Sequence, residues 1–162
     1  MNEEKLIQRD RMRFVKNSLS SSLCYLGILF NVFYFVLLYQ SDVGNYYYTI
    51  QIGASIVYNL LFLLVVFLAS EEVKNYNKSY SYILIGVGVM QIVRMFVIPA
   101  AAHAATIIVD GAEVSVMQGK QYTLSLVYLG ISAACLIIAA AVNVVKCSSL
   151  EAHRKYLESQ KA

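Results

Sequence analysis

The chain alternates between long apolar segments and short polar ones. The apolar segments are residues 19–39, 48–69, 80–101 and 122–145, and the only charged side chain within them is Arg94. A helix rises about 1.5 Å per residue and the hydrocarbon core of a bilayer is about 30 Å thick, so about 20 apolar residues are enough to cross it. The pattern predicts an all-α integral membrane protein, a bundle of four transmembrane helices in which sequence neighbours pack antiparallel.

The composition strengthens this prediction. Hydrophobic residues make up 59% of the 162-residue chain and charged residues only 14%, against about 45–50% and about 25% in soluble domains. We expect the chain to be surrounded by membrane lipids, to lie in the cell membrane, and to have no nucleic-acid partner. The whole chain is expected to form a single membrane domain.

Basic residues predict the orientation, because Lys and Arg accumulate in cytoplasmic loops. Eleven of the 13 basic residues lie in the tail 1–18, in the loop between the second and third segments, and in the tail 146–162. The loop 102–121 has Lys120 alone, and Arg94 is the remaining one. Both termini are therefore predicted to be cytoplasmic, with the loop 102–121 outside.

That outer loop contains a hairpin signal. Asp110-Gly111 lies between two runs rich in β-branched residues, 105–109 and 112–116, and such a pair favours a tight turn with positive φ at both central residues. A lone two-stranded hairpin is only marginally stable in water. We therefore expect its apolar side chains to need cover from this chain or from another subunit; these are Ile107, Val109, Val114 and Val116. The competing interpretation is that 106–109 prolongs the third helix.

Three further signals concern helix ends and packing. Pro99 is expected to end or bend the third helix. Ser148 with Glu151 three residues later fits a capping box, which predicts a helix that starts in the C-terminal tail. The fourth segment is the richest in small residues, so we expect it to pack centrally or against a partner.

Arg94 is the most informative residue. It is expected in the outer third of the membrane, and an arginine costs about 2.5–3.5 kcal/mol at the centre and less toward the interface. Polar residues in the spans suggest neighbours: Gln91 one turn away on the same face, Gln51 in the outer part of the second span, and Asn31 and Asn59 at greater depth. Three interpretations stay open. Arg94 extends outward to Asp42 or to a lipid phosphate, it pairs with another membrane subunit, or it lines a site for an anion or polar solute.

The sequence lacks the residues that several kinds of chemistry require. No Asp or Glu lies inside the four segments, whereas ion-coupled carriers usually need a membrane carboxylate. No His and Cys cluster has metal-ligand spacing, and neither a phosphate-binding glycine loop nor a nucleophile elbow occurs. The sequence predicts no catalytic residues, no metal and no cofactor.

Two functions of different classes remain. The first is a non-catalytic accessory or assembly subunit that docks on a channel, transporter or secretion core through its helix faces and its outer loop. The second is a homo-oligomeric pore or facilitator for an anion or small polar solute, lined by the intramembrane polar residues. The contact residues expected in the outer loops are Asp42, Ile107, Val109, Asp110, Gly111, Val114 and Val116.

Overall fold

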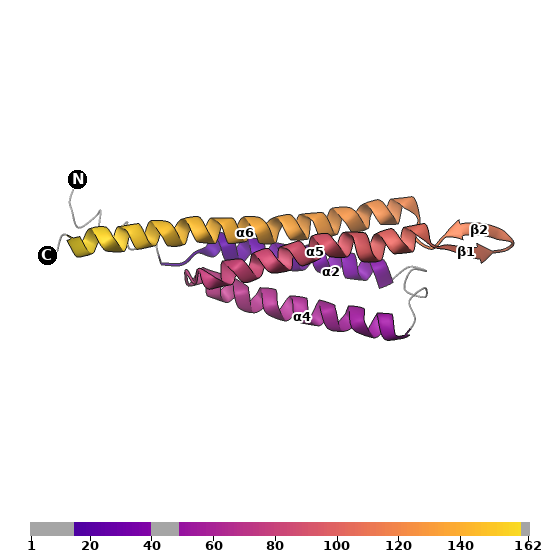
Figure 1. Ribbon diagram of the computed structural model, residues 1–162, viewed down its shortest axis with the longest axis horizontal. Coiled ribbons are helices and arrows are strands. Elements are labelled where there is room, and N and C mark those ends of the chain that lie inside the picture. The colour runs from indigo at the N-terminus through magenta and orange to yellow at the C-terminus, as the bar shows by residue number, and fades with distance from the viewer. Residues whose placement is uncertain (1–14, 40–48, 160–162) are drawn as a thin grey trace.

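The computed structural model describes residues 15–39 and 49–159. Four helices and one small sheet make up the described chain (Figure 1). In chain order the elements are α2 (Ser18–Tyr39), α4 (Thr49–Lys74), α5 (Ser79–Ala104), β1 (Thr106–Val109), β2 (Ala112–Ser115) and α6 (Gly119–Ser159).

All four helices are long and apolar enough to cross a membrane. The chain is therefore a multi-pass membrane protein, as the apolar segments predicted. α6 packs along both α2 and α5, and α4 packs against the same two helices from the other side (Figure 1). The start of α2, the α4–α5 turn and the end of α6 lie at one end of the bundle, here called the turn end, and the β-strands lie at the opposite, hairpin end.

The bundle is more polar inside than outside. On α2 the buried side chains recur at alternating intervals of three and four residues: Ser20, Cys24, Gly27, Asn31, Tyr34 and Leu38. Large apolar side chains such as Leu29, Val32 and Val36 face outward. Small and polar residues let membrane helices approach and hydrogen-bond, while lipid accepts the apolar exterior. The burial pattern thus fits a bundle whose solvent is hydrocarbon.

Two glycines mark the closest helix contacts. A Cβ on Gly27 would lie 3.1 Å from Leu136 Cδ2, and a Cβ on Gly88 would lie 2.9 Å from Ile137 Cγ1. Both neighbours belong to α6, whereas a Cβ on Gly86 would meet nothing within 4 Å. Glycine at positions 27 and 88 therefore allows α2 and α5 to approach α6, which lies along one side of the bundle and not at its centre (Figure 1).

The predicted hairpin is confirmed. β1 and β2 pair antiparallel, with Ile107 opposite Val114 and Ile108 opposite Glu113. Asp110 and Gly111 have φ of 53° and 83°, as the tight turn requires. The third helix does not continue through 106–109, so the competing interpretation was wrong.

Two expected helix boundaries are not found. Pro99 does not end α5, which runs on to Ala104, because alanines after the proline favour helix and a helix in a bundle can lose one N–H bond without ending. No new helix starts at Ser148, since α6 is continuous from Gly119 to Ser159. The Ser148 hydroxyl donates back to the Val144 carbonyl instead of capping a helix.

Candidate functional site

Arg94 lies inside the bundle and not at its surface. Its side chain is only 6% exposed, and its Nη1 donates to Asn59 Oδ1 at 3.1 Å and Asn31 Oδ1 at 3.3 Å. The guanidinium carbon lies 4.7 Å from the ring centroids of both Tyr34 and Tyr58. Arg94 is thus held by α2 and α4 through amides and aromatic rings, and not by extension toward a loop.

The asparagines belong to a hydrogen-bonded layer that joins all four helices, here called the Arg94 layer. Asn31 Nδ2 donates to Asn59 Oδ1 at 3.2 Å, and Gln91 Nε2 donates to Asn31 Oδ1 at 2.9 Å. Gln91 also approaches Ser132 Oγ on α6 at 3.5 Å, and that hydroxyl donates to the Gly27 carbonyl at 2.8 Å. The two asparagine oxygens that accept from Arg94 therefore each accept from a second donor as well.

The Arg94 layer has polar atoms left over. Among the described residues, the buried atoms without a hydrogen-bond partner include Arg94 Nε and Nη2, Tyr34 Oη, Gln91 Oε1 and Ser55 Oγ. Buried polar groups are paired in the large majority of cases. A cluster of unpaired atoms around a buried cation is therefore the strongest indication of a functional site in this bundle.

A groove leads from the outer surface to this layer. It lies between α2 and α4, has a volume of about 210 Å³, and reaches Asn31 and Asn59. Its other lining residues are apolar: Val32, Phe35, Ile56, Leu60 and Leu63. Since Val32, Ile56 and Leu60 are exposed on the exterior of the bundle, the groove opens on the surface that faces lipid.

A second polar layer lies nearer the turn end, here called the Asn143 layer. Asn143 accepts from Asn17 Nδ2 at 3.0 Å and donates to Ser81 Oγ at 2.8 Å and to the Asn77 carbonyl at 3.0 Å. The backbone N–H of Asn17 donates to the Lys74 carbonyl at 2.9 Å. Here every amide group finds partners, so this layer ties the start of α2, the end of α4 and the start of α5 to the middle of α6.

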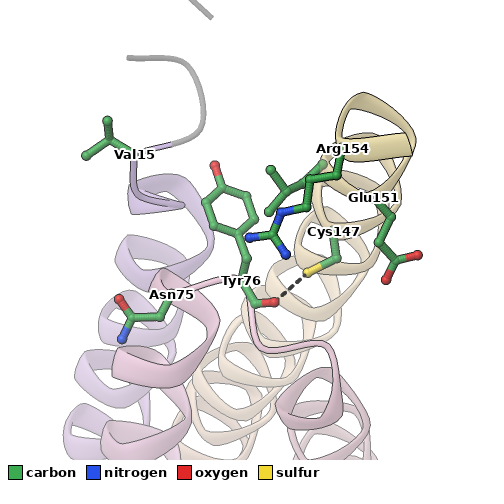
Figure 2. A pocket seen from close by; sticks show the side chains of 7 residues that line it. Val15, Asn75, Tyr76, Cys147, Glu151 and Arg154 are labelled. Atoms are coloured by element: carbon green, nitrogen blue, oxygen red, sulfur yellow. Dashed lines mark hydrogen bonds between the residues drawn. The ribbon is translucent and has the colours of Figure 1, made fainter. Parts of the chain in front are cut away.

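A surface pocket of about 350 Å³ lies beside the Asn143 layer. Figure 2 shows Arg154 reaching from α6 toward the Tyr76 ring, while the Glu151 carboxylate points away. The Cys147 thiol donates to the Tyr76 carbonyl at 3.2 Å.

Tyr76 follows the end of α4 in a left-handed backbone conformation, with φ of 63°. This conformation costs a non-glycine residue about 1–2 kcal/mol. The N–H of Tyr76 donates to the Val73 carbonyl and so closes the end of the helix. Burial and then the nearby Cys147 raise the pKa of Tyr76.

The hairpin is anchored at its base and uncovered at its tip. Val116 and Met117 are buried among side chains of α2, α5 and α6. Ser115 Oγ donates to the His103 carbonyl at 2.8 Å, and the His103 ring stacks on Tyr122 with centroids 4.6 Å apart. Beyond this base, the strands extend away from the helices (Figure 1).

The structure brings Arg94, Gln91, Asn31 and Asn59 together, as the sequence analysis grouped them. Gln51 lies on α4, with its side chain outside the described part, and Asp42 lies outside the described residues altogether. The two tyrosines around Arg94 and the whole Asn143 layer were missed. For Tyr34 a signal was available, because it lies three residues after Asn31 on the same face of the helix.

The chain matches no protein-family model and resembles none of the curated proteins or solved structures with which it was compared. Within the described residues, no group of three His, Cys, Asp or Glu side chains is arranged to hold a metal ion.

Proposed function

We propose that this protein is a non-catalytic accessory subunit that docks on another membrane protein through its hairpin and adjoining helix faces. The observation that carries the proposal is the uncovered apolar surface of the hairpin. Ile107 is 38% exposed, Val114 41% and Ile108 77%. Strands β1 and β2, which carry these residues, extend past the end of the helices (Figure 1).

The register assigns these side chains to two faces. Alternation along each strand puts Ile107, Val114 and Ala112 on one face, and Thr106, Ile108 and Glu113 on the other. The first face is apolar throughout. Because a two-stranded hairpin is marginal in water, a partner that covers this face gains apolar burial and also fixes the hairpin.

We further propose that the termini are cytoplasmic, that the hairpin is extracytoplasmic and that the protein lies in the cell membrane. The bias of eleven basic residues against one supports this orientation. The arrangement of the helices also supports both termini being on one side of the membrane, since α2 begins and α6 ends at the same end of the bundle (Figure 1). Labelling of single cysteines at positions 108 and 158 with a membrane-impermeant reagent tests it, and labelling from the same side of the membrane would overturn it.

Photo-crosslinking in native membranes tests the docking. A photoreactive residue at Ile107 or Val114 is expected to capture one stoichiometric partner, and the same residue at Thr106 on the opposite face serves as the matched control. Ile107→Lys with Val114→Lys is expected to abolish co-purification in mild detergent, whereas Thr106→Lys leaves it unchanged. Recovery of an uncrosslinked lone chain from native membranes would overturn the proposal.

The alternative, a homo-oligomeric pore, has weaker support. Its lining residues would have to face a channel between subunits, yet Asn31, Gln91 and Arg94 are buried within one bundle. Solute flux into liposomes that is lost in Arg94→Gln would favour the pore over the docking subunit.

A further inference from the structure

We infer that the pocket at the turn end, between the start of α2, the α4–α5 turn and α6, binds the phosphate headgroup of an anionic membrane lipid. The inference does not depend on the docking proposal, because this pocket lies at the opposite end of the bundle from the hairpin (Figure 1). It also holds for either orientation of the chain, since polar headgroups cover both surfaces of a bilayer.

The pocket lies at the depth of the headgroups. Its first lining residue on α6 is Cys147, two residues past the apolar segment that ends at Val145. Its last is Arg154, seven residues and about 10 Å further along the helix. A bilayer measures about 40–45 Å with its headgroups and about 30 Å without them, which leaves a polar layer of about 5–8 Å at each surface. Since the Arg154 side chain reaches toward Tyr76 (Figure 2), its guanidinium is placed near that layer.

Arg154 gives the pocket a positive charge. Glu151, the acidic residue of the lining, points away from the guanidinium (Figure 2). Within the part of the chain that the structure describes, no ion pair involves Arg154. Lys78 adds a second cation, because it lies close enough to the Cys147 thiol to act on it electrostatically, as Glu151 also does. An anion in the pocket thus meets two cations and one carboxylate that faces elsewhere.

The wall that faces Arg154 is fixed by the fold. The backbone N–H of Tyr76 donates to the Val73 carbonyl at 3.2 Å, and the carbonyl of Tyr76 accepts from the Cys147 thiol at 3.2 Å. Both backbone groups are therefore held in place by the protein itself. A pocket that is formed before its ligand arrives loses little free energy to ordering when the ligand binds.

The lining defines the ligand. A guanidinium donates two parallel N–H bonds that match two oxygens of a phosphate, and basic pockets at a membrane surface bind lipid headgroups. Val15, which is 64% exposed, and Leu150, which is partly buried, add apolar surface beside this charge. The volume of about 350 Å³ is that of a site for a small molecule. A charge next to apolar surface suits a lipid better than a free phosphate ion.

The test uses the full-length protein in an uncharged detergent, with dioleoyl phosphatidylglycerol as the probe. Because a ligand that binds only the folded state stabilises it, this lipid is expected to raise the midpoint of thermal unfolding. Dioleoyl phosphatidylcholine, whose headgroup has no net charge, and inorganic phosphate, which has no acyl chains, are expected to leave the midpoint unchanged. An equal shift with either of these two would overturn the anionic lipid as the ligand, and no shift with phosphatidylglycerol would overturn the site.

Substitutions at two neighbouring positions of α6 locate the site. Arg154→Gln is expected to abolish the shift. Lys155→Gln removes the same charge from an exposed residue outside the lining and is expected to retain the full shift. Equal losses in the two variants would show that the lipid responds only to the total charge of the turn end, and would overturn the pocket.

Two further variants test the contacts within the pocket. Arg154→Lys keeps the charge but loses the two-donor edge, and is expected to need about fivefold more lipid for the same shift. Glu151→Gln removes the nearby carboxylate and is expected to need no more lipid than the wild type. An unchanged response in Arg154→Lys would overturn the two-donor contact, and loss of the shift in Glu151→Gln would overturn the assignment of Arg154 as the residue that holds the headgroup.

Discussion

The two buried polar layers of this bundle are built from similar residues but differ in how completely these residues are hydrogen-bonded. In the Asn143 layer, one amide joins α2, α5 and the α4–α5 turn, and each of its polar atoms is paired. In the Arg94 layer, two asparagines and a glutamine also join the helices, but donors of Arg94 and Tyr34 remain unpaired. The first layer is complete as a structural element, whereas the second keeps unpaired donors around a buried cation.

The difference shows that the burial of a polar group and its hydrogen bonding are separate indications of its role. Both layers are buried, so burial alone would give both of them a stabilising role. A saturated network specifies packing, while a buried group without partners calls for an explanation in function. Mutations in the two layers should therefore differ in effect, and the following expectations run from the largest to the smallest.

Asn143→Ala should cause the largest loss of stability. It removes the acceptor of Asn17 Nδ2 and the donor to Ser81 Oγ, and leaves a buried amide unpaired, which costs about 2–3 kcal/mol. Thermal unfolding in mild detergent measures this loss of stability. Ser149→Ala is the control, because that exposed hydroxyl donates only within its own helix; an equal loss in both variants would contradict the structural role of the layer.

Gly88→Val should weaken both layers at once. Ser81 and Gln91 reach α6 from either side of Gly88, and a side chain there collides with Ile137. Overpacking of this kind costs about 1–3 kcal/mol. Gly86→Val, which points into open space, should be neutral in the same assay, and equal destabilisation by the two variants would show that the α5–α6 approach is not the cause.

Removing one hydroxyl from each layer compares the layers directly. Ser81→Ala loses a paired hydroxyl and should cost about 1 kcal/mol. Tyr34→Phe loses an unpaired one while it keeps the ring against Arg94, so the ligand-free protein should not change by more than about 0.5 kcal/mol. If Tyr34→Phe proves the more harmful, the phenol has a partner and the comparison fails.

Arg94→Met should have little effect on the stability of the protein. Asn31 Oδ1 keeps its bond from Gln91, and Asn59 Oδ1 keeps its bond from Asn31, so no acceptor is left alone. Removal of an uncompensated buried charge offsets the lost contacts, as when a hydrophobic residue replaces a buried ion. We expect a change within about 1 kcal/mol by thermal unfolding; a loss above about 3 kcal/mol would make Arg94 a structural residue like Asn143.

Local features were well predicted from the sequence. The four helices follow from the length of the apolar segments, and the hairpin follows from Asp110-Gly111, because a backbone that needs two positive φ angles leaves few alternatives. Helix ends were less well predicted. Pro99 and Ser148 are strong local signals in isolation, but the packing of α5 and α6 sustains helix through both positions.

The site was predicted only as a set of residues. Hydropathy placed Gln91 near the depth of Arg94 and placed Asn31 and Asn59 deeper, but depth does not say which way a side chain points. The rotation of each helix about its own axis decides that Asn31 faces Arg94 and that Tyr34 and Tyr58 enclose it. The sequence by itself thus determined how often the chain crosses the membrane and where it turns. Only the packing of the helices, at glycines 27 and 88, decided which polar groups meet and which are left without a partner.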